Sequence, residues 1–259
     1  DSVKSRGLGD VYKRQGEIAD LFDAFLLDAF GVLNVGDTAI AGAAQRAQML
    51  KDMGKDVLVL TNGACFPAEQ ALKKFLSFGI PLEIADIVSS RAALAAAIPP
   101  LPDSGFWGVM STQNSHVETL GIPWKRLEND MSIYDAASGF ILLSTLEWTE
   151  AQQMLLQESL AKVARPILVG NPDIVAPRGR YLSLEPGYYG HKLGSELKIQ
   201  AKFFGKPFTN IYDLAFSRLP NIDPSRVVMV GDTLHTDVLG GAAYGCLLYT
   251  SPSPRDFTE

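Results

Sequence analysis

The sequence predicts an α/β protein with a doubly wound parallel sheet and a second α/β domain inserted into it. Short, continuously apolar runs such as 24–27 and 57–60 are typical of parallel strands that are covered on both faces. Segments with helical spacing separate these runs, and this alternation indicates βαβ units. The length of 259 residues and the hydrophobic content of 47% are sufficient for a large buried core.

The first part of the chain supplies the opening strands and helices of the sheet. Small and apolar residues recur at helical spacing over 41–53 and stop at Gly54, which is a C-terminal helix signal. Pro67 begins the next helix, and Gly79 ends it. In chain order, we predict strands at 24–27, 57–60 and 84–88 and helices at 41–53, 67–79 and 89–98.

A proline-rich tract, 99–105, breaks this pattern and predicts the start of the inserted domain. We therefore predict a first core segment at 16–98, an inserted cap domain at 99–192 and a second core segment at 193–245. The inserted domain is expected to contain strands at 106–110, 140–143 and 167–169 and a long helix at 149–163, and the segments 181–184 and 187–190 end it. The second core segment is expected to contain helices near 195–204 and 211–218 and a strand at 227–230.

The two ends of the chain share one unusual property. Residues 9–15 are a translation of the DNA string GGAGATGTGTATAAGAGACAG, and residues 246–251 are a translation of its reverse complement. Both ends therefore resemble a sequencing adapter joined to a gene fragment, and we leave 1–15 and 246–259 out of the fold prediction. We also expect the chain to lack native strand and helix material after residue 245.

The composition argues against several classes of function. Without the two ends, whose formal charges are +2 and −1, the net charge of −6 becomes −7, and an acidic balance argues against a nucleic-acid partner. No apolar stretch reaches the roughly 20 residues of a membrane helix, so we expect no membrane partner. Cys65 is the one cysteine outside the ends, which predicts no disulfide and a reducing, cytoplasmic location.

Three polar residues stand at or just after the C-terminal ends of predicted strands: Asp28, Thr61 and Asp232. In open α/β sheets, ligands bind outside this edge, so three distant stretches of sequence are expected to converge on one crevice. Each aspartate alone also fits a turn former or a helix N-cap. The convergence of all three residues indicates a functional site.

Four short segments resemble, in order, the four motifs of the haloacid dehalogenase (HAD) superfamily. They are Asp28-Ala29-Phe30-Gly31-Val32-Leu33, Leu60-Thr61-Asn62, Gly205-Lys206-Pro207 and Gly231-Asp232-Thr233-Leu234-His235-Thr236-Asp237. The long interval before the lysine is similar to that of class IIA, which has a large α/β cap and includes sugar-phosphate, nitrophenyl-phosphate and pyridoxal-phosphate phosphatases. The resemblance covers 16–245 and implies a Rossmann-like core with an inserted cap.

The resemblance implies a nucleophile and a metal site, and the chemistry of the residues agrees. Asp28 is the predicted nucleophile, because a carboxylate can attack phosphorus and form an aspartyl phosphate. Two anionic groups approach each other in this step, so a divalent cation is required. Asp28, Asp232 and the backbone carbonyl of Phe30 are the predicted ligands, and hard oxygen ligands suit Mg²⁺.

The remaining motif residues are predicted to hold the phosphoryl group. Thr61 offers a hydroxyl, Asn62 offers backbone and amide donors, and Lys206 offers a compact positive charge. We therefore predict Thr61 and Lys206 as catalytic residues in addition to the nucleophile. Asp237 is expected to lie behind them, where it orients the lysine or a metal-bound water, although an ordinary helix N-cap is the alternative.

Phe30 departs from the motif. In many phosphatases of the superfamily this position is an aspartate that protonates the leaving oxygen, a contribution of roughly 10²–10⁴-fold. Three explanations stay open: the leaving group departs without a proton, another residue such as His235 replaces the aspartate, or the reaction is not phosphate ester hydrolysis. True haloacid dehalogenases carry an aromatic residue here and expel halide. His235 also fits an exposed loop residue without a role in the reaction.

Substrate choice is expected to depend on the cap. The turn Asn171-Pro172-Asp173 and the neighbouring Arg178 and Arg180 either face the crevice or form a solvated polar turn, and we prefer the polar turn. The sequence thus predicts a Mg²⁺-dependent phosphatase for a small phosphorylated metabolite, with a homodimer through the cap as one assembly. The alternatives are a catalytically weak protein that binds a phosphorylated ligand and a hydrolase similar to 2-haloacid dehalogenases.

Overall fold

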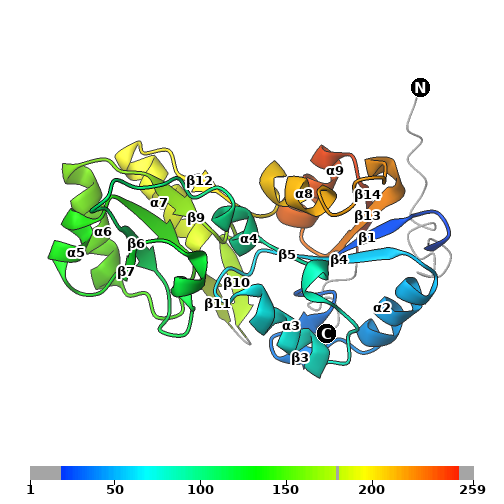
Figure 1. Ribbon diagram of the computed structural model, residues 1–259. Helices are drawn as coiled ribbons and strands as arrows, with labels where there is room; N and C mark the ends of the chain where they lie inside the picture. Colours follow the sequence, from blue (N-terminus) through cyan, green and yellow to red (C-terminus); the bar gives the residue numbers. More distant parts are fainter. Residues whose placement is uncertain (1–18, 179–180, 251–259) are drawn as a thin grey trace.

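The computed structural model describes residues 19–178 and 181–250, which form two α/β lobes side by side (Figure 1). Each lobe is built on a five-stranded sheet in which all neighbouring strands are parallel. The predicted α/β class is therefore confirmed. Within the described ranges, no helix is long and apolar enough to cross a membrane.

The core sheet has the strand order β14-β13-β1-β4-β5. Its strands are β1 (Ala24–Asp28), β4 (Asp56–Thr61), β5 (Ile87–Ser89), β13 (Val227–Gly231) and β14 (Leu247–Thr250). Consecutive side chains of β1 point to opposite faces, so Phe25 and Leu26 belong to two different apolar clusters. Because both faces are covered, all residues of β1 and β13 are buried.

Helices cover both faces of the core sheet. The helices α2 (Ala43–Asp52) and α3 (Ala68–Ser77) lie below it in Figure 1, and α8 (Thr209–Phe216) and α9 (Leu239–Tyr244) lie above it. Between the lobes lies the short helix α4 (Ser90–Ala95). This arrangement leaves the ends of the strands as the open edges of the core sheet, which is where ligands bind in such folds.

The cap sheet has the strand order β12-β9-β8-β6-β7. Its strands are β6 (Trp107–Met110), β7 (Trp124–Arg126), β8 (Gly139–Leu142), β9 (Ile167–Val169) and β12 (Lys202–Phe203). The helices α5 (Met131–Ala136), α6 (Glu150–Lys162) and α7 (Pro186–Leu197) contribute to the apolar cluster on one face. On the other face, Ile141 and Leu143 share a cluster with Leu94 of α4, so the two lobes have a continuous apolar contact.

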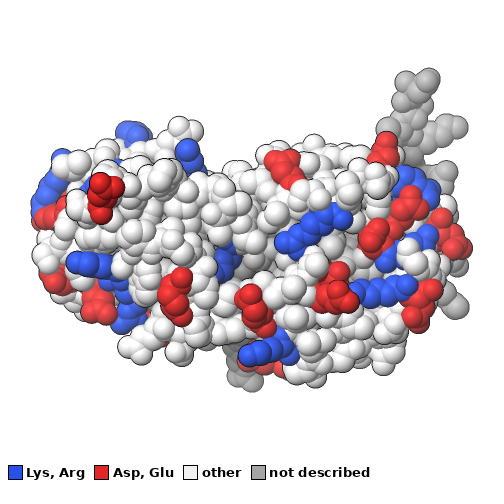
Figure 2. All heavy atoms as spheres, in the orientation of Figure 1, with Lys and Arg blue, Asp and Glu red and all other residues white. Residues whose placement is uncertain are grey.

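Two small antiparallel pairs complete the fold. The strands β2 (Asn34–Val35) and β3 (Thr38–Ala39) follow the turn after β1. The strands β10 (Val175–Arg178) and β11 (Tyr181–Leu184) form a hairpin that extends from the cap. On the face shown in Figure 2, acidic and basic side chains are interspersed over both lobes and the surface narrows between them. The absence of a nucleic-acid partner stays a prediction.

The second core segment was predicted wrongly at its start. The helix expected near 195–204 is absent: α7 ends at Leu197, and Lys198 has a left-handed backbone with φ of 57°. After it, β12 pairs with β9 in the cap sheet, beyond the predicted cap boundary at residue 192. The helix was placed too late because Pro186, in the first turn of α7, begins it before residue 195. The strand β12 was missed because two residues are too few to show a periodic pattern.

The C-terminal segment takes part in the fold, contrary to our expectation. Residues 247–250 form β14, which pairs in parallel with β13 at the edge of the core sheet. Cys246, just before it, is buried in an apolar cluster. An edge strand uses mainly backbone donors and acceptors, and Tyr249 and Thr250 favour strands, so a short segment of this composition completes a sheet.

Candidate active site

The predicted site residues lie at the C-terminal edge of the core sheet. Asp28 is the last residue of β1, Thr61 is the last residue of β4, and Asp232 follows the last residue of β13. The strands β4 and β13 lie on either side of β1, so the strand order reverses at β1. Such a switch point opens a crevice at the carboxyl ends of the strands, and the convergence expected from the sequence is found there.

Lys206 lies at the centre of this crevice. Its Nζ donates hydrogen bonds to Oδ1 of Asp28 and to Oδ1 of Asp237, both at 2.6 Å. Lys206 is 2% exposed and Asp237 is 1% exposed, so these ion pairs are shielded from water. Burial alone lowers the pKa of Lys206, but the two carboxylates outweigh it and raise that pKa above its ordinary value. The lysine is therefore a fixed positive charge beside the predicted nucleophile.

The carboxylate of Asp28 is held through one oxygen. Its Oδ1 accepts from Lys206 and, at 2.7 Å, from the backbone N–H of Ala29. Among the described residues, no hydrogen bond ends on its Oδ2, so this atom is free to contact a ligand. Burial, together with the negative charge of Asp237, raises the pKa of Asp28 to about 7 despite the lysine.

Asn62 fixes the backbone of Lys206. Its Oδ1 accepts from the Lys206 N–H at 2.7 Å, and its Nδ2 donates to the Lys206 carbonyl at 3.0 Å. The same Nδ2 donates to Oδ1 of Asp173 at 2.8 Å, so both amide N–H groups are engaged. The prediction that this amide donates to a phosphoryl group is therefore wrong for the geometry found. Its backbone N–H stays a predicted donor.

Thr61 has the opposite property, because its hydroxyl hydrogen is available. Its Oγ1 accepts from the N–H of Gly63 at 3.1 Å, which fixes the oxygen in a turn. A hydroxyl that accepts in this way can still donate, so the geometry leaves Thr61 able to bind an anion as predicted.

Three carboxylates form a cluster that suits a cation. Oxygens of Asp28, Asp232 and Asp237 lie within 4.8 Å of one another. Burial, together with the negative charge of Asp237, raises the pKa of Asp232. An all-oxygen donor set of this kind fits a hard divalent ion such as Mg²⁺.

The turn after β1 brings backbone close to this cluster. Gly31 has φ of 88°, and a Cβ on it would lie 2.5 Å from Oδ2 of Asp232, so only glycine fits. In the described part of the chain, no hydrogen bond ends on the carbonyl of Phe30, which leaves that oxygen available as the predicted third ligand. The side chain of Phe30 is half-buried and carries no proton donor.

The loop after β13 places Asp237 and His235 differently. The loop contains one π-helical turn, Leu234–Val238. Oδ1 of Asp237 accepts from Lys206, and Oδ2 accepts from the Thr233 N–H at 3.1 Å. Both oxygens are engaged by donors, which matches the predicted role of orienting the lysine. His235 is exposed, and among the described residues no hydrogen bond joins its side chain to the site.

The cap turn 171–173 faces the crevice, which corrects our preference for a solvated polar turn. The side chain of Asp173 reaches the core through its hydrogen bond with Asn62. Burial raises the pKa of Asp173. The side chains of Arg178 and Arg180 lie outside the described part of the structure. The sequence indicated a turn after a strand, but it did not indicate that Asp173 in this turn pairs with Asn62, which lies 111 residues away in the chain.

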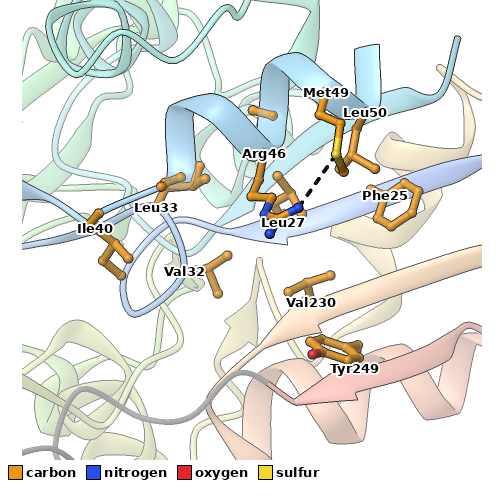
Figure 3. A pocket seen from close by; sticks show the side chains of 14 residues that line it. Phe25, Leu27, Val32, Leu33, Ile40, Arg46, Met49, Leu50, Val230 and Tyr249 are labelled. Atoms are coloured by element: carbon orange, nitrogen blue, oxygen red, sulfur yellow. Dashed lines mark hydrogen bonds between the residues drawn. The ribbon is translucent and has the colours of Figure 1, made fainter. Parts of the chain in front are cut away.

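A separate pocket of about 320 Å³ lies beside the core sheet (Figure 3). Apolar side chains of β1, α2 and β14 surround it, among them Phe25, Leu50 and Tyr249. Arg46 is its one charged residue and contacts Met49. None of the predicted site residues lines this pocket, and it lacks the convergent donors that a phosphoryl group requires, so we do not assign the active site to it.

Comparison with known proteins agrees with the motif order and the fold. Residues 25–120 match a family model described as haloacid dehalogenase-like hydrolase, and residues 203–249 match one described as HAD-hydrolase-like, so the matches include both halves of the core. The chain belongs to the HAD superfamily of hydrolases. The two matched ranges contain Asp28, Thr61, Lys206 and Asp232.

Relatives of this HAD protein extend the match over most of the chain. The 5′-nucleotidase YutF of Bacillus subtilis is 24% identical over 238 residues, with 91% of this chain and 90% of the relative covered. A NipSnap protein of Caenorhabditis elegans is 28% identical over 263 residues; the match covers 91% of this chain, which spans about half (49%) of that longer protein.

A solved structure shows the same arrangement of core and cap. The HAD protein from Cytophaga hutchinsonii, described as a possible sugar phosphatase, superposes with a TM-score of 0.83 at 24% identity, covering 94% of this chain and 90% of that one. At this identity the likeness establishes the fold, including a cap of the class IIA type, and not the substrate.

Proposed function

We propose that the protein is a Mg²⁺-dependent phosphatase that hydrolyses a small phosphorylated metabolite through an aspartyl phosphate on Asp28. The observation that carries the proposal is the position of Lys206 between Asp28 and Asp237. One oxygen of the nucleophile is fixed by a buried cation, and the other has no donor in the described structure. Two of the similar proteins, a 5′-nucleotidase and a possible sugar phosphatase, support the proposal that the reaction is phosphate ester hydrolysis.

The residues divide the reaction into two displacements. Asp28 attacks phosphorus through Oδ2 while the bond between phosphorus and the ester oxygen breaks and the alcohol departs. Water then attacks the same phosphorus, the bond between phosphorus and Asp28 breaks, and phosphate is released. Lys206 lowers the pKa of Asp28 against the larger effect of burial, and it offsets the charge of the transferring group. Thr61 donates its hydroxyl hydrogen to a phosphoryl oxygen, and Asp237 keeps the lysine in place.

The ligands for Mg²⁺ in this proposal are Asp28, Asp232 and the carbonyl of Phe30. When bound, Mg²⁺ supplies positive charge that reduces the repulsion between carboxylate and phosphate. Gly31 is what allows the turn and Asp232 to approach closely enough to form such a site.

Phe30 favours a second candidate function, a protein that binds phosphorylated ligands and turns them over slowly. A phenylalanine cannot protonate a leaving alkoxide, so esters of poorly acidic alcohols would be bound but cleaved slowly. Esters of acidic leaving groups, such as 4-nitrophenyl phosphate, separate the two candidates. Rapid turnover of this ester supports the phosphatase, and tight binding without turnover supports the binding protein.

The Mg²⁺ requirement is expected to depend on pH. In the metal-free protein the pKa of Asp28 is raised to about 7, so a proton must leave before the cation binds below that pH. The same raised pKa makes the metal-free fold lose stability as pH rises from about 4 to 7. We expect the apparent affinity for Mg²⁺ to rise about tenfold per pH unit up to pH 7 and then to level off.

Two measurements on the same samples check this expectation. Thermal melts at pH 5.5, 6.5 and 8 with increasing Mg²⁺ give the affinity, and release of nitrophenolate with and without Mg²⁺ gives the activity. In Asp28→Asn, the pH dependence between 5.5 and 7 should decrease sharply, because the principal titrating ligand is gone. Equal Mg²⁺ affinity at pH 5.5 and pH 8 in the unaltered protein, or turnover without any divalent cation, would contradict the proposed metal site.

A further inference from the structure

The cap contacts the catalytic lysine of the proposed phosphatase through one intermediate side chain. Asp173, on the turn after β9, accepts a hydrogen bond from Asn62, which follows β4 in the core. Asn62 in turn binds both the N–H and the carbonyl of Lys206. Three residues distant in sequence thus form a continuous hydrogen-bonded chain from the cap to the backbone of Lys206.

The turn that carries Asp173 is fixed within the cap. The N–H of Asp173 donates to Oδ1 of Asn171 at 3.0 Å, and the carbonyl of Asp173 accepts from the N–H of Gly187 in α7 at 3.1 Å. A Cβ on Gly187 would lie 2.1 Å from the carbonyl oxygen of Pro172, so the helix and the turn are in direct contact. The backbone that carries the Asp173 carboxylate is therefore placed by the cap.

The core side of the contact is equally confined. Gly205 has φ of 121°, and a Cβ on it would lie 2.6 Å from Oδ1 of Asn62 and 2.9 Å from Pro172. Ser90 donates to the carbonyl of Asn62 at 2.8 Å and is fully buried. The amide of Asn62 has little freedom to translate, and the main freedom left to it is rotation by half a turn.

Such a rotation would exchange the oxygen and the nitrogen of the amide. The oxygen would then face the carbonyl of Lys206 and the nitrogen its N–H, and both hydrogen bonds would be lost. In the rotated amide the oxygen of Asn62 would also face the acceptor oxygen of Asp173, so the hydrogen bond from Nδ2 to that oxygen favours the orientation in which Nδ2 faces Asp173. This is the orientation that binds Lys206 through both backbone groups.

From this geometry we propose that Asp173 is a positioning residue, which selects the orientation of the Asn62 amide and thereby fixes Lys206 between Asp28 and Asp237. The inference rests on the proposed function. It implies that turnover depends on the cap lying against the core so that Asp173 contacts Asn62. The cap contributes an acceptor here, not a group that touches the phosphoryl centre.

Other contacts keep the lobes together when this one is removed. Nη2 of Arg91 donates to the carbonyl of His116 in the cap lobe at 2.7 Å, while Nη1 donates to the carbonyl of Ala64 in the core at 3.0 Å. Leu94 also packs against the cap sheet near Gly170. Loss of the Asp173 carboxylate is therefore expected to release Asn62 without detaching the cap.

Two substitutions test the proposal by steady-state hydrolysis of 4-nitrophenyl phosphate. Asp173→Ala is expected to lower kcat by about 10–100-fold with little change in KM, because a misplaced lysine weakens stabilisation of the transition state. Asp173→Asn retains an acceptor oxygen and is expected to stay within about threefold of the unaltered protein. Asp103→Ala, at an exposed position of the loop before β6, is the matched control.

A second readout does not require activity. The Lys206 N–H is buried and bonded to Asn62, so its hydrogen exchange in protein labelled with 15N-lysine should accelerate at least about tenfold in Asp173→Ala and not in Asp173→Asn. Absence of turnover in the unaltered protein would reject the proposed function, while this exchange rate would still decide the role of Asp173. The proposal is overturned if Asp173→Ala leaves both kcat and exchange unchanged, or if Asp173→Asn is as impaired as Asp173→Ala.

Discussion

Asp28→Asn is expected to reduce kcat for 4-nitrophenyl phosphate by about 10³-fold or more, because an amide cannot attack phosphorus and form the covalent intermediate. The substitution preserves the size of the side chain. Lys206 keeps its ion pair with Asp237, so the fold is expected to persist. Phosphate release under saturating Mg²⁺ is the measurement, with a melt to verify folding.

The matched control for this variant is Asp56→Asn. Asp56 begins β4, the strand next to β1, and is exposed at the opposite edge of the same sheet. The chemical change is identical, but the position is remote from Lys206, so activity should be unaffected. If Asp28→Asn retains more than about a tenth of the activity, Asp28 is not the nucleophile.

Phe30→Asp is expected to have the largest gain of activity. A carboxylic acid two residues after Asp28 can protonate the leaving oxygen, which raises hydrolysis of an alkyl phosphate by roughly 10²–10⁴-fold. The effect on 4-nitrophenyl phosphate should be much smaller, since nitrophenolate departs without a proton. The backbone carbonyl of residue 30 is unchanged, so Mg²⁺ binding should persist.

Phe30→Asn separates acid catalysis from a change in polarity or space. Asparagine has nearly the same shape as aspartate but no acidic proton, so it should leave hydrolysis of glycerol phosphate near the level of the unaltered protein. An equal gain from Asn and Asp would show that Phe30 limits the rate by its bulk. No gain from either would show that the missing proton donor is supplied elsewhere.

The features of the fold that the sequence predicted well are those with a local cause. The strands β1, β4 and β13 are continuous apolar runs because both faces of the core sheet are covered. The helix α6 begins at a capping box formed by Thr149 and Gln152, a local signal that fixes its first turn. Such elements carry their own signature in a few neighbouring residues.

The features that the sequence did not predict depend on contacts between distant segments. Strand β12 exists because β9 offers an unpaired edge, and nothing in Lys202 or Phe203 displays that partner. The same holds for Asp173, whose acceptor oxygen matters only because Asn62 lies opposite. The amide of Asn62 was predicted to be available for a phosphoryl group, but in the structure it is hydrogen-bonded to the backbone of Lys206 and to the carboxylate of Asp173.

The most direct test of the account is to search for the covalent intermediate. The protein is mixed with 4-nitrophenyl phosphate and Mg²⁺, quenched in acid within the first turnover, and digested for mass spectrometry. We predict one phosphoryl group on the peptide that contains Asp28, labile to hydroxylamine as an acyl phosphate is, and none in Asp28→Asn. Phosphate release that proceeds with no phosphoryl group on Asp28, or with the group on another residue, would contradict the proposed mechanism.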